Sequence, residues 1–265
     1  MVVEGIAGAG VALAGAFAWA RTRRVRAYRI LADRLSLIRR APAAALGLEE
    51  RALPDFRDSL VTFANFLPAP AFAVLKGEAE ALALPERGFV PVQRKGGTVA
   101  YETLIATAPA IVSYYHSAEL MRLVSRLAGV DVRPTPLHDQ SSLSVLSYTA
   151  PGDHIGWHYD HNFYRGRHFT LLLSIANEGS APGGSSHATL TARLGDREVQ
   201  IATPPNTLVV FEGARVRHRV TPIGENERRV ILSMTYCADP RSHWWQGMPR
   251  RIKDTAFYGT RALWS

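Results

Sequence analysis

A histidine and an aspartate two residues apart, His158 and Asp160, end the stretch LSVLSYTAPGDHIGWHYD of residues 143–160. Side chains along an extended strand repeat with a period of two, so this imidazole and this carboxylate point to the same side and can share one metal ion. A histidine about sixty residues downstream, His218, would complete a set of two imidazoles and one carboxylate. That set holds non-haem Fe(II) on one face and leaves coordination positions open for other ligands.

The strands that must position these residues appear as eight short apolar runs separated by turn residues. They are residues 143–148, 155–158, 169–175, 188–194, 199–201, 207–211, 218–220 and 229–236. Such closely spaced short strands are typical of an all-β sandwich or jelly roll. Before Pro134 the pattern is mixed. It predicts helices at 70–82 and 117–127 and extended segments at 56–66 and 89–92.

Three further features accompany the His-x-Asp pair: a Gly-Gly turn at residues 183–184, a strand leading into His218, and two arginines, Arg228 and Arg229, entering the last strand. Together they resemble the iron(II)- and 2-oxoglutarate-dependent dioxygenases, in particular the prolyl-4-hydroxylase-like branch. The resemblance covers about residues 66–238 and depends mainly on residues 143–236. It implies an α+β fold, in which a double-stranded β-helix (a cupin-like jelly roll) at about residues 143–237 is supported by N-terminal helices.

The resemblance also implies roles for individual residues. His158, Asp160 and His218 are expected to bind Fe(II) and form the catalytic centre, with 2-oxoglutarate and dioxygen at the open positions and ascorbate as an accessory reductant. The far carboxylate of 2-oxoglutarate requires a cation, and arginine offers a planar bidentate fork. Because Asp160 is a carboxylate, the sequence argues against a halogenating relative, since such relatives typically lose this ligand to open a chloride position.

Arg228 and Arg229 lie on opposite faces of their strand, so one of them is expected to bind the cosubstrate. Arg229 shares its face with Ile231, Ser233 and Thr235, and this hydroxyl-bearing face suits a pocket for a polar cosubstrate. We therefore favour Arg229 and keep Arg228 as the alternative. Tyr148 is a candidate hydrogen-bond donor to the same cosubstrate.

Each of these residues also has a plainer explanation. His158 and Asp160 could be a surface pair on a strand, and His218 could be a hydrogen-bonded turn histidine. At least one of the two arginines is expected to be an ordinary charged residue at a strand start. The combination of the pair, the distal histidine and the late arginine favours the metal site over these alternatives.

Charge is concentrated at the N-terminus. The chain has 265 residues and a formal net charge of +8, but residues 1–40 alone hold eight arginines against Glu4 and Asp33. The remaining residues are therefore nearly neutral, and we expect no nucleic-acid partner. Cys237 is the only cysteine, which excludes an intrachain disulfide and a zinc site built from several cysteines.

Residues 2–20 are apolar apart from Glu4 and precede the basic run RTRRVR. We expect them to form a single-pass membrane anchor that leaves the catalytic body in the cytoplasm, although the seven alanines and four glycines make the segment only weakly apolar. The alternative is a soluble cytoplasmic protein, with this helix packed on the body or unstructured. Residues 21–40 read as a basic amphipathic helix that docks on either anionic headgroups or the body. A linker at 41–53 would then precede the dioxygenase domain at 54–265.

The expected reaction is hydroxylation of an unactivated C–H bond, coupled to decarboxylation of 2-oxoglutarate to succinate and carbon dioxide. Demethylation, desaturation or cyclisation by the same oxidant are the alternatives within enzymes. The alternative from another class is a non-catalytic, membrane-attached binding module on the same fold. The substrate class stays open between a small molecule, a lipid-linked molecule and a protein side chain, because fold and site do not specify it.

Overall fold

A computed structural model describes residues 2–41, 45–82, 86–90, 94–242 and 244–258. Its α-helices are α1 (Val2–Arg40), α2 (Ala69–Ala81), α3 (Tyr101–Thr107), α4 (Pro109–Tyr115), α5 (Ala118–Ala128) and α6 (Gly247–Tyr258). Two short 3₁₀ turns lie at Pro182–Gly184 and Trp244–Gln246. The strands up to β6 are β1 (Leu60–Phe63), β2 (Glu86–Val90), β3 (Arg94–Val99), β4 (Arg133–Pro134), β5 (Leu143–Tyr148) and β6 (His154–His158). The later strands are β7 (Arg165–Glu178), β8 (Leu190–Leu194), β9 (Arg197–Ile201), β10 (Leu208–Glu212), β11 (Arg217–Val220) and β12 (Arg228–Asp239).

The strands form one curled antiparallel sheet with the order β1-β10-β7-β12-β5-β3-β6-β11-β8-β9, to which β2 and β4 add at β3 and β12. The two longest strands, β7 and β12, pair along most of their length at the centre. Because the sheet curls, β6 and β11 face β5, β12 and β7 across an interior pocket. This arrangement is a jelly roll with helices, and each of the eight strands expected between residues 143 and 236 is present within a few residues of its predicted bounds.

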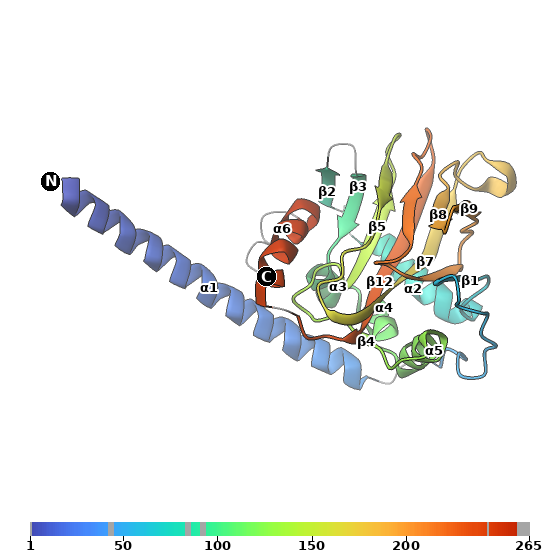
Figure 1. The fold of residues 1–265 in the computed structure, drawn as a ribbon, viewed down its shortest axis with the longest axis horizontal. Helices are drawn as coiled ribbons and strands as arrows, with labels where there is room; N and C mark the ends of the chain where they lie inside the picture. The colour runs from blue at the N-terminus through green and yellow to red at the C-terminus, as the bar shows by residue number, and fades with distance from the viewer. Residues whose placement is uncertain (1, 42–44, 83–85, 91–93, 243, 259–265) are drawn as a thin grey trace.

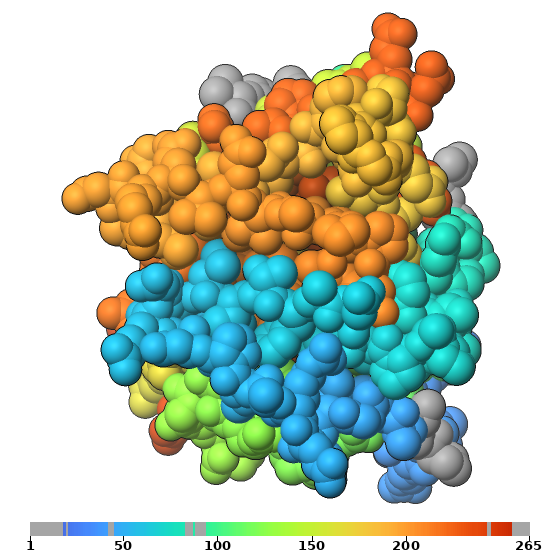
Figure 2. All heavy atoms as spheres, turned by 90° about the vertical axis from the view of Figure 1, so that its right-hand side faces the viewer, coloured from blue at the N-terminus to red at the C-terminus, as the bar shows by residue number. Residues whose placement is uncertain are grey.

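The helices cover the outer face of the major sheet (Figure 1). Their apolar side chains and the outward residues of β5, β7 and β12 form the larger of the buried clusters. Helix α5 has the boundaries that its sequence predicts: the Ser117 hydroxyl caps its N-terminus by accepting from Leu120 N, and Gly129 ends it with a left-handed φ of 65°. The predicted helix at 70–82 is α2. Figure 2 shows the segment that contains β1 lying directly against the strands of the C-terminal half, in agreement with the pairing of β1 with β10.

Some elements were not anticipated from the sequence. Strand β3 and helices α3, α4 and α6 have no counterpart among the expected elements. Strand β3 has the sequence RKGGTV. It is mostly buried, but its two glycines and two charged residues give no apolar pattern that would predict a strand. Helices α3 and α4 are each only seven residues long, too short for a clear helical period.

Helix α1 runs without a break from residue 2 to residue 40 and projects beyond the body at its N-terminal end (Figure 1). Leu31, Leu35 and Ile38 pack into the larger buried cluster, so the expected apolar stripe docks on the body at this end, while Val25 is exposed. The expected anchor at residues 2–20 is helical, but most of its side chains lie outside the described part. Within the described residues no helix is long and apolar enough to cross a membrane.

The segment after α1 has no regular structure but is held on the body. Leu46 and Leu48 are buried. Their backbone N–H groups donate to the two carboxylate oxygens of Glu119 on α5, at 2.9 and 3.0 Å. Residues 45–48 of the expected linker are therefore packed against the helices.

Candidate active site

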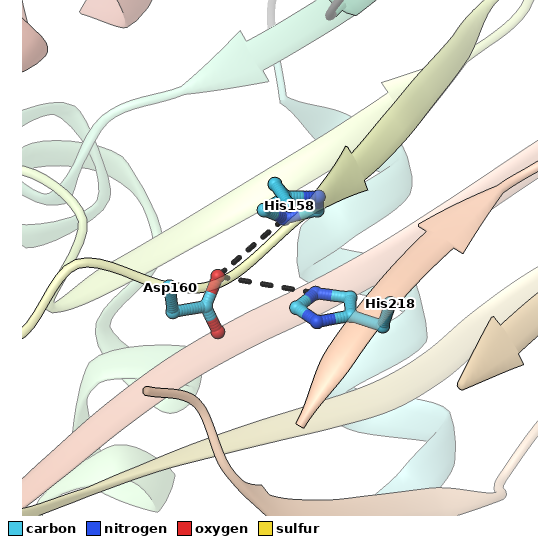
Figure 3. A group of neighbouring side chains, drawn as sticks. All are labelled: His158, Asp160 and His218. Atoms are coloured by element: carbon cyan, nitrogen blue, oxygen red, sulfur yellow. Dashed lines mark ion pairs between the residues drawn. The ribbon is translucent and has the colours of Figure 1, made fainter. Parts of the chain in front are cut away.

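His158, Asp160 and His218 come together where β6 ends beside β11 (Figure 3). His158 ends β6, His218 lies on β11, and the two are direct partners in the register of these strands. The nearest Asp160 oxygen, Oδ1, lies 3.5 Å from Nε2 of His158 and 3.9 Å from Nε2 of His218. One ligand atom from each of the three residues lies within 4.8 Å of the others, which is the arrangement that a single metal ion requires.

Both imidazoles are oriented by their own strands. Nδ1 of His158 lies 2.8 Å from the carbonyl oxygen of Gly156, and Nδ1 of His218 lies 3.1 Å from that of Val216. A carbonyl oxygen only accepts, so each Nδ1 carries a proton and each Nε2, the atom that a neutral imidazole offers to a metal ion, faces Asp160. Such a bond to the remote nitrogen fixes the tautomer and the ring plane of a metal-binding histidine.

The Asp160 carboxylate is fixed from two sides. The hydroxyl of Thr170 on β7 donates to Oδ2 at 2.5 Å, while the backbone N–H of Asp160 donates to the carbonyl of Gly213 at 3.0 Å. A Cβ on Gly213 would lie 2.7 Å from the Thr170 hydroxyl and 2.8 Å from the Asp160 side chain. Only glycine fits at residue 213 without a shift, because the backbone passes so close to the carboxylate.

The electrostatics of Asp160 and His218 suit a divalent cation, whereas burial would lower the pKa of His158 but the neighbouring Asp160 raises it. Burial alone would raise the pKa of Asp160, but His218, His158 and the Thr170 hydroxyl together hold it well below its usual range. Burial lowers the pKa of His218. At neutral pH the carboxylate is therefore ionised and the His218 imidazole is neutral, which are the forms that bind a metal ion.

A pocket of about 210 Å³ opens beside the triad, between the two halves of the curled sheet. Arg229 lies on its wall with Ile231, Ser233 and Thr235, so strand alternation placed this face correctly. The Arg229 side chain is 1% exposed and donates to the carbonyl of Ala188 at 3.3 Å. Its Nε has no partner among the described residues. Burial lowers the pKa of Arg229 to about 10, so the guanidinium stays charged at neutral pH.

Arg228 points the other way. Its guanidinium lies at the surface, 3.4 Å from carboxylate oxygens of Glu80 and of Glu178. Tyr148 lines the same pocket as Arg229 and is its direct partner in the pairing of β5 with β12. Burial raises the pKa of Tyr148, which keeps its hydroxyl protonated and able to donate.

Four further polar residues that line the pocket were not identified as site residues from the sequence. They are Arg94 on β3, His168 and Thr170 on β7, and Lys253 on α6. His168 is 4% exposed, and its Nδ1 has no hydrogen-bond partner among the described residues. Strand alternation along β7 could have found Thr170, but Arg94 and Lys253 arrive from β3 and α6, which the sequence did not reveal.

Comparisons with known proteins agree with this geometry. The family model described as "2OG-Fe(II) oxygenase superfamily" matches residues 143–236. A second model, described as "Halogenase D", matches residues 52–184, about half of the chain. No curated protein matches the chain.

Solved structures share the fold at low identity. A prolyl-4-hydroxylase from Pseudomonas putida has a TM-score of 0.50 at 24% identity, over 69% of this chain and 94% of its own. A prolyl hydroxylase from Trichoplax adhaerens, in complex with a hypoxia inducible factor peptide fragment, has a TM-score of 0.54 at 17% identity, over 69% and 84%. The non-haem α-ketoglutarate-dependent epimerase SnoN from nogalamycin biosynthesis has a TM-score of 0.55 at 17% identity, over 68% and 77%.

The residues of this chain fit the cofactors that such enzymes use. Two neutral imidazole nitrogens and one carboxylate form a donor set suited to Fe(II). In the same pocket, the buried Arg229 retains an unpaired Nε that a carboxylate of 2-oxoglutarate could satisfy. From the family match, the shared fold and this fit, we conclude that the chain belongs to the 2OG-Fe(II) oxygenase superfamily and uses Fe(II) and 2-oxoglutarate.

Proposed function

We propose that this protein hydroxylates an unactivated C–H bond of its substrate. In the balanced reaction, substrate, dioxygen and 2-oxoglutarate give the hydroxylated substrate, succinate and carbon dioxide. When bound, Fe(II) and 2-oxoglutarate supply the activation of dioxygen that the side chains alone cannot provide. The observation that carries the proposal is the complete triad of His158, Asp160 and His218 beside a pocket that holds a buried arginine.

Different side chains would bind the metal ion and the cosubstrate. His158, Asp160 and His218 would hold Fe(II) through two Nε2 atoms and a carboxylate oxygen, with Thr170 fixing the other oxygen. The guanidinium of Arg229 would donate to the far carboxylate of 2-oxoglutarate, and Tyr148 would donate a further hydrogen bond. Together they orient the cosubstrate and bring its charge into a buried site, where a charge-assisted bond is strong.

The substrate would bind at the other end of the pocket. Ser141, His168, Thr235 and Lys253 line that end, away from Arg229 and Tyr148. The unpaired Nδ1 of His168 suits a polar group of the substrate next to the bond that reacts. Once a substrate is identified, His168→Leu should raise its KM about tenfold, the effect of one lost hydrogen bond, while 2-oxoglutarate binding is unchanged. An unchanged KM would remove His168 from the substrate site.

Halogenation is a second candidate, which the match to the Halogenase D model favours. It requires a free coordination position for halide. Asp160 occupies the corresponding place with a fixed, ionised carboxylate. We therefore expect no halogenated product when turnover is run in excess chloride or bromide. Epimerisation and carbocyclisation are further possibilities, since the structurally similar α-ketoglutarate-dependent proteins SnoN and SnoK from nogalamycin biosynthesis are an epimerase and a carbocyclase.

Anaerobic protein loaded with Fe(II) provides the test. Adding 2-oxoglutarate and then dioxygen should give oxygen consumption and succinate in equal amounts, and His158→Ala should abolish both. A cell extract incubated with the enzyme and isotopically labelled dioxygen should yield a metabolite or peptide that gains one labelled oxygen. Failure to bind either Fe(II) or 2-oxoglutarate would rule out the proposal. A new product that carries no labelled oxygen would favour another oxidative outcome.

A further inference from the structure

Helix α1 has a second apolar line on the side that faces away from the body. Trp19, Ile30 and Leu37 are 62%, 60% and 67% exposed. They are 11 and 7 residues apart, and at 3.6 residues per turn these spacings return a side chain to within about 20° of the same direction. The body-facing residues Leu31 and Leu35 point roughly the opposite way. Three large apolar side chains on one exposed line are unusual for a helix that has no partner there.

Arginines border this line on both sides. Arg23 lies on one side, with its guanidinium 4.7 Å above the Trp19 ring, while Arg26 and Arg29 lie on the other side. All three are exposed. Between residues 18 and 41 the chain has eight arginines and a single acidic residue, Asp33. The face is therefore apolar along its centre and strongly basic along its edges.

The apolar surface continues from α1 into the body. A groove of about 510 Å³ lies between α1, α2 and α4, with Leu37, Val74, Leu75 and Tyr114 on its walls. Leu37 belongs both to the line on α1 and to this groove, and Val74 across the groove is 55% exposed. The exposed surface thus extends along the 19 residues of α1 from Trp19 to Leu37 and on to Val74 of α2.

We propose that this face, the outer side of residues 19–40 with the groove at its end, binds the surface of an anionic phospholipid bilayer, with α1 lying in the plane of the headgroups. Trp and aliphatic side chains enter the boundary between headgroups and acyl chains. The arginine stems extend over this apolar layer and keep their guanidinium groups at the phosphates. Each basic residue near an anionic leaflet contributes about 1 kcal/mol.

Two other partners fit the face less well. A nucleic acid would contact the arginines but would leave the three apolar side chains exposed to water. A second copy of α1 would bring Arg23 and Arg26, which border the line, against the same positive charges of its partner, and these repel across a symmetric contact. An anionic bilayer satisfies both parts of the surface. The inference is independent of the reaction that the pocket performs.

Flotation of the full chain with phosphatidylcholine vesicles, with and without phosphatidylglycerol, tests this proposal. We expect binding to the anionic vesicles alone, and weaker binding as salt is raised. The variant Ile30→Glu/Leu37→Glu should reduce binding at least about tenfold, because each lost aliphatic contact contributes about 1.5–3 kcal/mol when fully buried. The variant Arg23→Glu/Arg26→Glu/Arg29→Glu should reduce it about 100-fold or more, at about 1 kcal/mol for each arginine removed.

A matched control reverses the same number of charges on the body. The exposed residues Arg57, Arg197 and Arg215 changed together to Glu should leave vesicle binding within about threefold, since they lie outside this face. Thermal unfolding confirms that each variant is folded. Equal binding to neutral and anionic vesicles that survives in both α1 variants would assign attachment to residues 2–17 and overturn the proposal. So would binding of single-stranded DNA, or self-association reversed by Ile30→Glu/Leu37→Glu, without vesicle binding.

Discussion

At the scale of single residues, the triad depends on neighbours that contribute no ligand atom. Gly156 and Val216 fix the two imidazoles through their carbonyl groups, and Thr170 fixes the carboxylate. These bonds hold the three candidate ligand atoms within 4.8 Å of one another. Such pre-organisation reduces the entropy that binding an ion would otherwise cost.

Gly213 is expected to be as important for iron binding as a ligand. Gly213→Ala would place a Cβ 2.8 Å from the Asp160 side chain, so the carboxylate must move away from the imidazoles. Altered surroundings of a metal ligand typically cost 10- to 100-fold in affinity, and we expect a loss of about that size for Fe(II), measured by anaerobic titration. Gly77→Ala is the matched control, because a Cβ there meets nothing within 4 Å and the site is helical. Equal Fe(II) affinity in the two variants would contradict this account.

The two adjacent arginines offer an internal comparison for the cosubstrate. Arg229→Gln should weaken 2-oxoglutarate binding about 10- to 100-fold, because a hydrogen bond between charged groups contributes about 1.5–3 kcal/mol. Arg228→Gln should have no effect, since that side chain is paired at the surface with Glu80 and Glu178. Calorimetry on protein with a redox-inert divalent ion measures both. The affinity of the wild type should fall as pH rises through about 10, where Arg229 loses its proton. A larger loss for Arg228→Gln would reverse the assignment.

At the scale of elements, the sequence was informative wherever a strand is short, apolar and bounded by turns. Strands β5 to β12 were each anticipated, because jelly-roll strands alternate between the pocket and the outer cluster. Strand β3 was missed because its glycines weaken the apolar pattern, and it is stabilised by pairing with both β5 and β6. Such long-range pairing leaves no local signal.

The residues of the site likewise divide into those with a local sequence signal and those without one. His158, Asp160 and His218 could be predicted because their residue types and spacing form a motif, and the arginine face followed from alternation along β12. Arg94 and Lys253 could not, since they reach the pocket from elements whose positions depend on the whole sheet. Gly213 could not either, because its role depends on how closely the turn after β10 approaches Asp160. Local sequence therefore predicted which three residues the fold brings together, but not the residues that hold them in place.

Glu119 joins two elements that are distant in sequence. Its carboxylate accepts from Leu46 N and Leu48 N and so fixes the segment after α1 to α5. Burial alone would raise the pKa of Glu119. The hydrogen bonds from these N–H groups lower it by more, so the pKa lies below its usual value. Glu119→Gln should reduce the free energy of unfolding at neutral pH by about 1–2 kcal/mol, by weakening charge-assisted bonds.

The pH dependence of this loss follows from the sign of the shift. A carboxyl group whose pKa is lowered on folding stabilises the protein above its unfolded pKa, and this stability is lost as pH falls through the folded value. The difference between Glu119→Gln and the wild type should therefore shrink in acid, as measured by urea unfolding. Glu178→Gln, at an exposed ion pair, should change stability by less than about 0.5 kcal/mol. A difference for Glu119→Gln that persists at low pH would exclude the charge as its cause.

At the scale of the whole molecule, helix α1 divides into two parts with different roles. From Arg24 onward it is tied to the body by an ion pair with Glu102 at 3.1 Å, by a hydrogen bond from Arg34 to the Ala106 carbonyl, and by the buried Leu35. The N-terminal half extends past the body (Figure 1). The basic charge of the chain lies mostly on this one helix, while the pocket and its triad belong to a nearly neutral body.

Two truncations should distinguish the contributions of these two parts of α1 to the stability of the protein. Removing residues 1–22 leaves the ion pair of Arg24 and the docked side chains in place, so the midpoint of thermal unfolding should hardly change. Removing residues 1–44 also removes Leu31, Leu35 and Ile38 from the buried cluster. At about 1.5–3 kcal/mol for each fully buried aliphatic side chain, and less where burial is partial, we expect a loss of at least about 3 kcal/mol. Leu35→Ala in the full chain should reproduce about 2 kcal/mol or more of it, because a core leucine is truncated without deleting the helix. If both truncated proteins unfold at the wild-type temperature, the docking of α1 does not stabilise the body. The face of α1 that carries Leu31, Leu35 and Ile38 would then be as exposed as its outer face.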